Sequence, residues 1–415
     1  MKTKLVIFGI SGDLSRRKLL PALSSIIASG NFSDVEIIGV SRQELNPTEL
    51  FDATLIGKST IFSMDLANLA DYKKLKNHVN AGEDDQLLMY LSVPPAAAHQ
   101  IIDLLGEAGL NQSNTKLLIE KPFGVDYASA IDMNSRLANY FNEQQIYRID
   151  HYLAKEMAQN IVTFRGSNAL FSHMWNGTFI EKIEIEASET LGIEGRGQFY
   201  EQTGALRDVV QGHLMQLLSL MLMEVPSKLE WDELPKHRQA ALTAIFSADP
   251  ALAKRAQYKG YQEEVANPGS LTETFVHLEL FSTHPRWKGV NFSLTAGKAL
   301  AKKTTEIRVH FKKMHDAQGN LLTLRIQPNE GVEMELFTKK PGYDHVLEPQ
   351  RLSFLYPDDT ILPDAYEQVL VDAIRSRKSL FASSGEVLES WRILQPILDS
   401  WEMDPTPLAV YNRTV

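Results

Sequence analysis

Residues 148–156 bring together more groups suited to binding a phosphorylated sugar than any other stretch of the chain. They read Arg-Ile-Asp-His-Tyr-Leu-Ala-Lys-Glu. If the chain is helical from Tyr152 onward, His151 and Lys155 lie four residues apart on one face, with Tyr152 beside them. Two potential cations, a phenol and the free N–H groups of a helix start would then surround a phosphate dianion. The alternative interpretation is an ordinary capped helix start at the surface.

The composition restricts the classes of protein that can be considered. A chain of 415 residues with 44% hydrophobic content can build two domains or one large one, each with a substantial core. The net charge of −10 argues against a nucleic-acid or anionic-membrane surface. The absence of cysteine excludes disulfides, thiolate nucleophiles and cysteine-based zinc sites, and we expect no metal.

The N-terminal apolar run is a strand candidate rather than a signal peptide. Residues 5–10 are apolar, but Gly12-Asp13 and the basic residues 16–18 follow before any site that resembles a cleavage site. No stretch approaches the ~20 apolar residues needed to span a bilayer. We therefore expect a cytoplasmic protein that contacts no membrane.

The first part of the chain alternates apolar strands with helices. Strands are predicted at residues 5–8, 36–40, 86–93 and 116–119, with helices after the first and third of them. This alternation predicts a parallel, Rossmann-like sheet over residues 1–150, with the ends of its strands converging on a cofactor.

Two features of this domain suit a dinucleotide. The spacing Gly9-x-x-Gly12 between a strand and a helix allows a tight turn that brings the backbone close to a pyrophosphate, although a non-binding turn is about equally compatible with it. Arg42 follows the second strand, where an enzyme that prefers NAD usually carries an acidic residue. A guanidinium there suits the 2′-phosphate of NADP, but it also tolerates NAD.

Beyond residue 150 the pattern changes to the alternation of half-buried strands. Such strands are predicted at residues 180–186, 274–281, 305–311, 322–326 and 332–337. They predict an α+β domain over residues 151–415, built on a mostly antiparallel sheet that is covered by helices on one face. Residues 204–223 read as a long apolar helix, and two helices are expected between residues 363 and 401, followed by a loosely packed tail.

The long apolar helix carries a candidate general base. His213 lies at one edge of it, and Asp208 lies nearby. Histidine is the side chain best matched to proton abstraction near neutral pH when a carboxylate fixes its tautomer. A hydrogen-bonded histidine in the core is the commoner role at such a position.

Taken together, the motifs resemble the glucose-6-phosphate dehydrogenase family over nearly the whole chain. Residues 148–153 carry the most specific similarity. The other segments are Gly-Ile-Ser-Gly-Asp-Leu-Ser-Arg-Arg-Lys-Leu-Leu-Pro at 9, Glu-Lys-Pro-Phe-Gly at 120, Arg-Asp-Val-Val-Gln-Gly-His at 207, Gly-Lys-Ala-Leu at 297 and Gln-Pro-Asn-Glu at 327.

The resemblance implies NADP-dependent oxidation of D-glucose 6-phosphate at C1, the first step of the oxidative pentose phosphate pathway. It makes His213 the general base and Asp150 the carboxylate that orients it. The implied substrate ligands are His151, Tyr152, Lys155, Lys121, Glu189, Asp208, Lys298, Lys303 and Gln327. The implied cofactor contacts are Gly9, Ser11, Gly12, Asp13, Leu14, Lys18, Arg42, Pro94 and Lys121.

Two departures from the family pattern leave alternatives open. Gly212 stands where a side chain usually adjoins the base, and Ala154 replaces a glycine before Lys155. A dehydrogenase of another or a modified hexose 6-phosphate is the first alternative, and a non-catalytic sugar-phosphate or nucleotide sensor is the second. The family also implies a homodimer or homotetramer, which a large sheet with one open face favours.

Overall fold

The computed structural model describes all residues except 1, 83, 227, 229, 315–317, 358, 414 and 415. The chain divides into two compact units, and each of them collects segments that are distant in sequence. Unit 1 comprises Met1–Ala154, Trp231–Pro235 and Pro363–Val387. Unit 2 comprises Lys155–Glu230, Lys236–Leu362 and Leu388–Val415.

Unit 1 is built on a seven-stranded sheet in the order β15-β6-β5-β4-β1-β2-β3. Its strands are parallel except for β15, which runs antiparallel to β6. They span β1 Thr3–Phe8, β2 Val35–Ser41, β3 Ser59–Ser63, β4 Gln86–Leu91, β5 Thr115–Ile119, β6 Ile146–Ile149 and β15 Phe381–Ala382. The six parallel strands follow the classic order 3-2-1-4-5-6 of dinucleotide-binding sheets in reverse.

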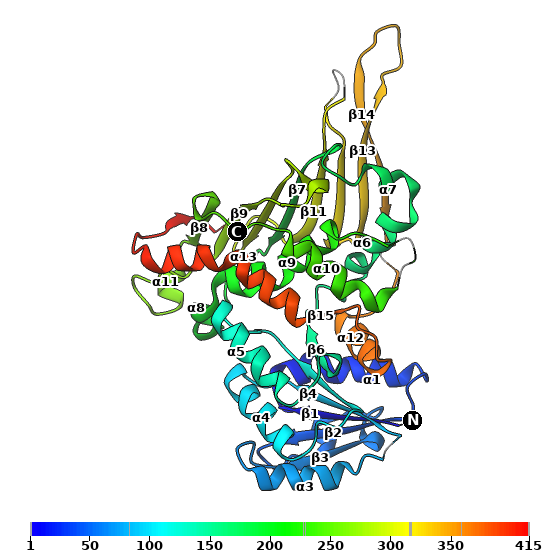
Figure 1. The fold of residues 1–415 in the computed structure, drawn as a ribbon, viewed down its shortest axis with the longest axis vertical. Coiled ribbons are helices and arrows are strands. Elements are labelled where there is room, and N and C mark those ends of the chain that lie inside the picture. The colour runs from blue at the N-terminus through cyan, green and yellow to red at the C-terminus, as the bar shows by residue number, and fades with distance from the viewer. Residues whose placement is uncertain are drawn as a thin grey trace. The chain divides into compact units, whose positions relative to one another are not determined.

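Helices cover both faces of this sheet, which is why its central strands are continuous apolar runs. Every residue of β4 is buried. Helices α1 and α12 lie side by side over one face, and α3, α4 and α5 lie on the other (Figure 1). The helical elements are η1 Ser15–Leu19, α1 Leu20–Ala28, α2 Pro47–Leu50, η2 Ile56–Lys58, α3 Leu69–Val79, α4 Pro95–Glu107, α5 Tyr127–Ala138, η3 Glu143–Gln145, η5 Trp231–Glu233 and α12 Ala365–Ile374.

The segment Pro363–Val387 returns from the C-terminal part of the chain to complete unit 1. Its strand β15 adds to the edge of the sheet by pairing Phe381 with Ile149. Lys116, in strand β5, donates from Nζ to the Ala373 carbonyl oxygen near the end of α12, at 2.6 Å. Lys378 donates to the Ile146 carbonyl oxygen at 2.6 Å. Backbone pairing and partly buried ammonium groups therefore hold the segment against the sheet.

Unit 2 is built on a nine-stranded sheet in the order β14-β13-β12-β11-β7-β10-β9-β8-β16. Most neighbours are antiparallel, but β10 runs parallel to β7 and β16 parallel to β8. The strands span β7 Ile180–Ser188, β8 Ala253–Tyr258, β9 Phe275–Leu280, β10 Asn291–Gly297, β11 Thr304–Phe311, β12 Leu321–Gln327, β13 Gly331–Lys339, β14 Leu347–Leu355 and β16 Ala409–Tyr411.

Burial alternates along β9, β11 and β12, as expected where one face of a sheet is covered more fully than the other. In β11 every second residue is buried, and the others are partly exposed. Segments η4 and α6 pack against β7, β10 and β12 on the covered face. The helical elements are α6 Glu156–Ser167, α7 Ala169–Met174, α8 Gly197–Ala205, η4 Leu206–Leu214, α9 Met215–Leu222, α10 Leu234–Thr243, η6 Pro250–Leu252, α11 Tyr261–Glu264, η7 Pro285–Trp287 and α13 Ser384–Met403.

The predicted fold class is confirmed, whereas two local expectations were wrong. Helix α6 begins at Glu156 rather than at Tyr152, with Lys155 as its N-cap residue in an extended conformation. His151 and Lys155 therefore do not share a helix face. The tail also forms strand β16, which pairs with β8. In the part of the chain that is described, no helix has both the length and the apolar character required to cross a membrane.

Candidate functional site

The carboxyl ends of the parallel strands in unit 1 carry that unit's candidate ligand-binding residues. Ligands of open α/β sheets bind where the strand order reverses, and here that point lies between β1 and β4. Gly9 follows β1 and Ser92 follows β4. The Ser15 hydroxyl bridges them: it donates to the Gly9 carbonyl oxygen at 3.0 Å and is hydrogen-bonded to the Ser92 hydroxyl at 3.1 Å.

The glycine turn fits a nucleotide pyrophosphate. Gly9 has φ = +79°, and a Cβ there would lie 2.1 Å from the Ser92 carbonyl oxygen. The Gly12 N–H donates to the Gly9 carbonyl oxygen at 2.9 Å, which closes the turn before the helical run. The predicted contacts Ser11, Asp13 and Leu14 lie in this turn and at the helix start, whose N–H groups favour an anion.

The other predicted cofactor contacts lie around the same edge. Pro94 is the N-cap residue of α4, just past β4. Arg42 directly follows β2 and is exposed, as a contact to a ribose phosphate requires. Lys18 is half-exposed and pairs with Asp364 at 3.2 Å between Nζ and Oδ2. The residues present therefore fit a phosphorylated dinucleotide.

A buried acidic group marks the end of β5. Lys121, a predicted ligand of both substrate and cofactor, follows Glu120 at this end. The Tyr90 hydroxyl donates a hydrogen bond to the Glu120 carboxylate. Burial raises the pKa of Glu120 from its ordinary value of 4.5 to about 7, although Tyr90 and Lys121 oppose the rise.

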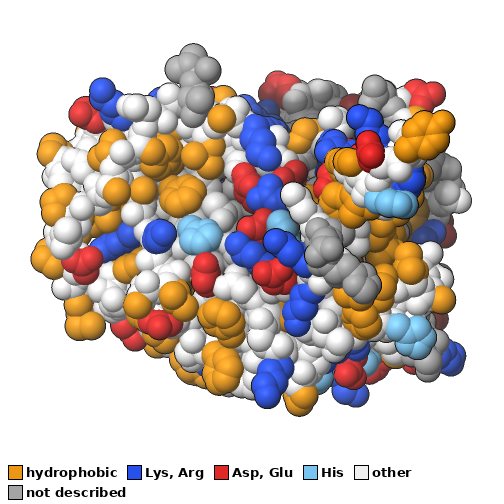
Figure 2. Space-filling model, turned by 90° about the horizontal axis from the view of Figure 1, so that it is seen from above, with side chains coloured by type: hydrophobic (Ala, Val, Ile, Leu, Met, Phe, Trp, Pro, Cys, Tyr) orange, Lys and Arg blue, Asp and Glu red, His pale blue; other side chains and the backbone are white. Residues whose placement is uncertain are grey.

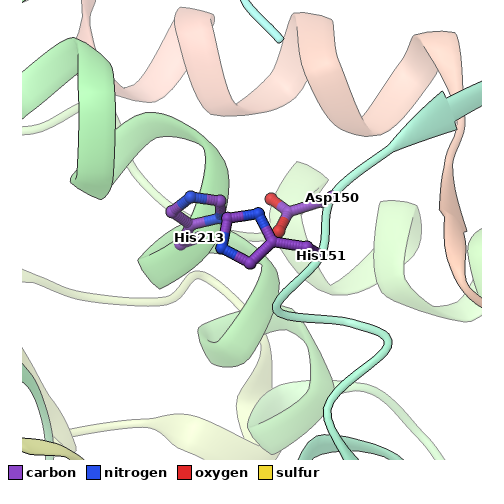
Figure 3. A group of neighbouring side chains, drawn as sticks. All are labelled: Asp150, His151 and His213. Carbon is purple, nitrogen blue, oxygen red and sulfur yellow. The ribbon is translucent and has the colours of Figure 1, made fainter. Parts of the chain in front are cut away.

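Asp150 and His151 follow β6 at the same edge, where Figure 3 draws them. Asp150 is only 2% exposed, and its Oδ1 accepts the Tyr152 N–H at 2.9 Å. The His151 ring stacks on Tyr366 with centroids 6.3 Å apart and meets Tyr152 edge-on at 5.1 Å. A tight turn, rather than a helix, thus holds the carboxylate and the imidazole in fixed directions.

Unit 2 carries its own group of candidate ligands at one end of its sheet. Ser188 ends β7 and is paired with both Gly297 at the end of β10 and Thr304 at the start of β11. The residues just beyond these positions are Glu189, Lys298 and Lys303. Backbone register alone therefore brings these predicted sugar ligands together.

Contacts between side chains reinforce this grouping. The Lys298 side chain is 3% exposed and lies 2.7 Å from Glu189, measured between Nζ and Oε2. Gln327 ends the next strand and donates from Nε2 to the Thr305 hydroxyl at 3.3 Å. Lys303 is exposed. The group offers an ion pair between the buried Lys298 and the partly exposed Glu189, an amide and an exposed cation to a polyhydroxylated ligand.

Asp208 and His213 are both on η4, a helical segment with wide, π-type turns that packs against β7 and β10. His213 is 6% exposed and Asp208 is half-buried. Figure 3 shows the His213 imidazole projecting from this segment. Gly212 has no positive φ, so the missing side chain leaves the helical backbone intact.

Lys155 belongs to unit 2, where it precedes α6. The adjacent helix start is occupied by Glu330, whose Oε2 accepts the Met157 N–H at 3.2 Å. Burial raises the pKa of Glu330, and the Lys155 charge opposes the rise. A carboxylate thus lies next to this predicted phosphate ligand.

Within unit 1 the structure gathers Lys121, Asp150, His151 and Tyr152 at one sheet edge, and within unit 2 it gathers Glu189, Lys298, Lys303 and Gln327. It also shows neighbours that the sequence analysis missed. Tyr366 and Asp364 come from the returning segment, and Tyr90 comes from β4. No signal in the sequence places residue 366 beside residue 151, since only the tertiary fold joins them.

The fold and the site define a class: a protein with a dinucleotide-binding sheet joined to an α+β unit that carries charged sugar-binding candidates. The family follows from two profiles that cover almost the whole chain. "Glucose-6-phosphate dehydrogenase, NAD binding domain" matches residues 6–56 and 51–160, and "Glucose-6-phosphate dehydrogenase, C-terminal domain" matches residues 162–414. The chain belongs to the glucose-6-phosphate dehydrogenase family, as its motifs indicated.

Individual relatives agree with this assignment. Glucose-6-phosphate 1-dehydrogenase of Chlamydia muridarum is 37% identical over 455 aligned residues, which cover 96% of this chain and 90% of the relative. The solved enzyme from Mycobacterium avium is 33% identical with a TM-score of 0.89, covering 99% and 94% of the two chains. A glucose-6-phosphate dehydrogenase solved in complex with glucose 6-phosphate is 28% identical with a TM-score of 0.93 and the same coverage.

The raised pKa of Glu120 predicts a stability change with pH. Between about 4.5 and 7 the folded state keeps a proton that the unfolded state has lost, so the group lowers the free energy of unfolding as pH rises through this window. Replacing Glu120→Gln removes this effect. The melting temperature of the variant minus that of the unmodified protein should be more positive at pH 7 than at pH 4.5.

The control for this measurement is Glu107→Gln, which changes an exposed carboxylate at the end of α4 in the same unit. Its difference in melting temperature should vary less with pH. Equal pH dependence in the two variants would contradict the assignment.

Proposed function

We propose that this protein oxidises D-glucose 6-phosphate at C1 to 6-phospho-D-glucono-1,5-lactone, with NADP as the hydride acceptor. The observation that carries the proposal is membership of the glucose-6-phosphate dehydrogenase family through both of its domains. Charged and polar candidates at the strand ends of each unit support the proposal. It makes the protein an oxidoreductase of carbohydrate metabolism, acting in the oxidative pentose phosphate pathway.

His213 is the proposed general base. The bound NADP supplies an electrophilic nicotinamide carbon that accepts the hydride leaving C1. The C1 hydroxyl loses its proton to a ring nitrogen of His213, and the C1–O bond becomes the lactone carbonyl, so charge and atoms balance. Asp150 fixes the imidazole tautomer and stabilises the imidazolium. A positioned base of this kind contributes roughly 10²- to 10⁴-fold to the rate.

The phosphate of the substrate is the proposed ligand of His151, Tyr152 and Lys155. Binding energy from this remote group fixes the sugar so that C1 meets its reaction partner, which raises kcat rather than affinity alone. Residues at the strand ends of unit 2 hold the sugar hydroxyls. They are Glu189, Asp208, Lys298, Lys303 and Gln327, together with Lys121 from unit 1.

The proposed cofactor site follows the carboxyl edge of the sheet in unit 1. Gly9, Ser11, Gly12, Asp13 and Leu14 cradle the pyrophosphate, and Arg42 meets the 2′-phosphate. Lys18, Pro94 and Lys121 complete the cofactor contacts. NAD remains a second acceptor because an arginine also packs on adenine.

The two alternative functions, a dehydrogenase of another hexose 6-phosphate and a non-catalytic sensor, have less support than the proposed one. The family relatives do not favour a different hexose 6-phosphate. A sensor would have no use for a base together with an orienting carboxylate, and His213 and Asp150 are both retained. We also propose that nucleotide binding resides in residues 1–150 and substrate binding in residues 151–415, and that the protein acts in the cytoplasm.

A homodimer is the proposed assembly, with a homotetramer as its extension. Strand β14 is an edge of the nine-stranded sheet, and its apolar side chains are exposed. Leu352 is 61% exposed and Phe354 is 53% exposed. Figure 2, seen from above Figure 1, shows hydrophobic side chains on both sides of a central band of charged ones. Such a surface suits symmetric burial against a second copy.

The first test is the absorbance of reduced nicotinamide with purified protein and glucose 6-phosphate. We expect reduction of NADP, and the ratio of its rate to that with NAD measures the contribution of Arg42. A different hexose 6-phosphate, assayed in parallel, should react more slowly. Folded protein that reduces neither cofactor with glucose 6-phosphate would refute the proposed function.

The base assignment predicts that His213→Asn lowers kcat by about 10²- to 10⁴-fold while substrate binding is retained. Asparagine keeps a polar side chain of similar reach but cannot take the proton. The matched control is His173→Asn, which alters an exposed histidine of α7. Unchanged turnover in the His213 variant would refute the role of His213 as general base.

The proposed assembly predicts a dimer in sedimentation at micromolar concentration. Leu352 and Phe354 are two residues apart and point to the same face of β14. Replacing both with glutamate should yield monomers by placing like charges in the interface. Leu170→Glu, at an exposed leucine of α7, should leave the dimer intact. A monomeric unmodified protein would rule out the assembly.

A further inference from the structure

A buried carboxyl group stands at the start of the helical segment that carries Asp208 and His213. Glu273 precedes β9 in unit 2 and is 5% exposed. Its Oε1 accepts the Leu206 N–H at 2.8 Å, and its own carbonyl oxygen accepts the Ala205 N–H at 3.0 Å. Side chain and backbone of one residue thus fix the first turn of η4.

The chain around Gly204 is shaped to admit this carboxylate. Gly204 has φ = +63° and ψ = 179°, which separates α8 from η4 by a kink. A Cβ at this position would lie 2.4 Å from Glu273 Oε1. A residue with a side chain would be strained and would displace the carboxylate, so Gly204 and Glu273 form one close-fitting pair.

The residue after Glu273 anchors the other side of the sugar site. The Thr274 carbonyl oxygen accepts the Lys298 N–H at 2.9 Å. Lys298 in turn forms the ion pair with Glu189. The dipeptide 273–274 is therefore tied directly both to the segment bearing the base and to the sheet end bearing the sugar ligands.

We propose that Glu273 is a positioning residue for the reaction: its carboxylate sets the start of η4, and thereby the direction of His213 and Asp208 relative to Lys298. The inference rests on the proposed function. Burial raises the pKa of Glu273, while the Leu206 N–H and the Arg207 charge oppose the rise.

Two substitutions of Glu273 distinguish the effect of where its acceptor oxygen lies from the effect of its charge. Glu273→Asp keeps the charge but withdraws the oxygen from Leu206 N–H by one methylene. Glu273→Gln keeps an oxygen at the same reach and loses the charge. If placement matters, kcat should fall about 10-fold or more in the Asp variant, because misplacing a reacting group by ~1 Å can cost about 100-fold. The Gln variant should stay within about threefold, since its hydrogen bond is retained.

The KM for NADP should be unchanged in both variants, because the proposed cofactor site lies in unit 1. A general loss of folded protein would instead lower the active fraction in every assay. Circular dichroism and melting temperatures establish folding, and Glu263→Gln in α11 is the control at an exposed carboxylate. If the Asp variant does not fold, Glu273→Met takes its place, because it keeps the side-chain length but offers no oxygen to the Leu206 N–H; kcat should then fall about 10-fold or more, and full kcat would overturn the role.

The outcomes are distinct from a failure of the proposed function. An unmodified protein that does not oxidise glucose 6-phosphate refutes the function itself. An active unmodified protein with full kcat in Glu273→Asp overturns the positioning role. A fall of about 10-fold or more in Glu273→Gln overturns it as well and assigns the effect to charge.

Discussion

The register of backbone pairing around Ser188 is the constraint on which the candidate sugar-binding group of unit 2 depends. Ser188 faces Gly297 across one neighbouring strand and Thr304 across the other. Because successive side chains point to opposite faces of a sheet, a slip of one residue would turn Glu189, Lys298 and Lys303 away from one another. The buried alternate residues of β7 and β11 oppose such a slip, since it would bring charges into the core. Burial of the apolar face of the sheet thereby fixes which polar residues meet at its end.

Burial affects the charged groups of this protein as much as ion pairing does. Lys298 is nearly inaccessible, yet it forms a close pair with the partly exposed Glu189. Glu120 and Glu273 are acids that burial disposes toward protonation, and each accepts a hydrogen bond. Buried polar groups need such partners, because an unsatisfied one costs roughly 1–3 kcal/mol. Rigid, satisfied polar contacts fix the direction of neighbouring groups, which is what a hydride transfer requires.

Much of this arrangement could be predicted from sequence because it follows local periodicity. The strand–glycine–helix start of unit 1 and the alternating strands of unit 2 each carry their pattern within a few residues. The start of α6 was misplaced since residues 151–155 contain no proline or glycine to mark a turn. Strand β15 is too short for any period to show. The contacts of Tyr366 and Glu273 depend on segments far apart in the chain, so residue types alone could not reveal them.

The return of residues 363–387 to unit 1 has a consequence for synthesis on the ribosome. The edge of β6 that receives β15 lies immediately before Asp150 and His151. During translation this strand edge and the surface that α12 covers stay without their partner segment until more than half of the chain has been synthesised after them. An open strand edge and bare apolar surface are what chaperones recognise and what drives association of nascent chains. Unit 1 is thus begun first and completed only after most of unit 2 has been synthesised.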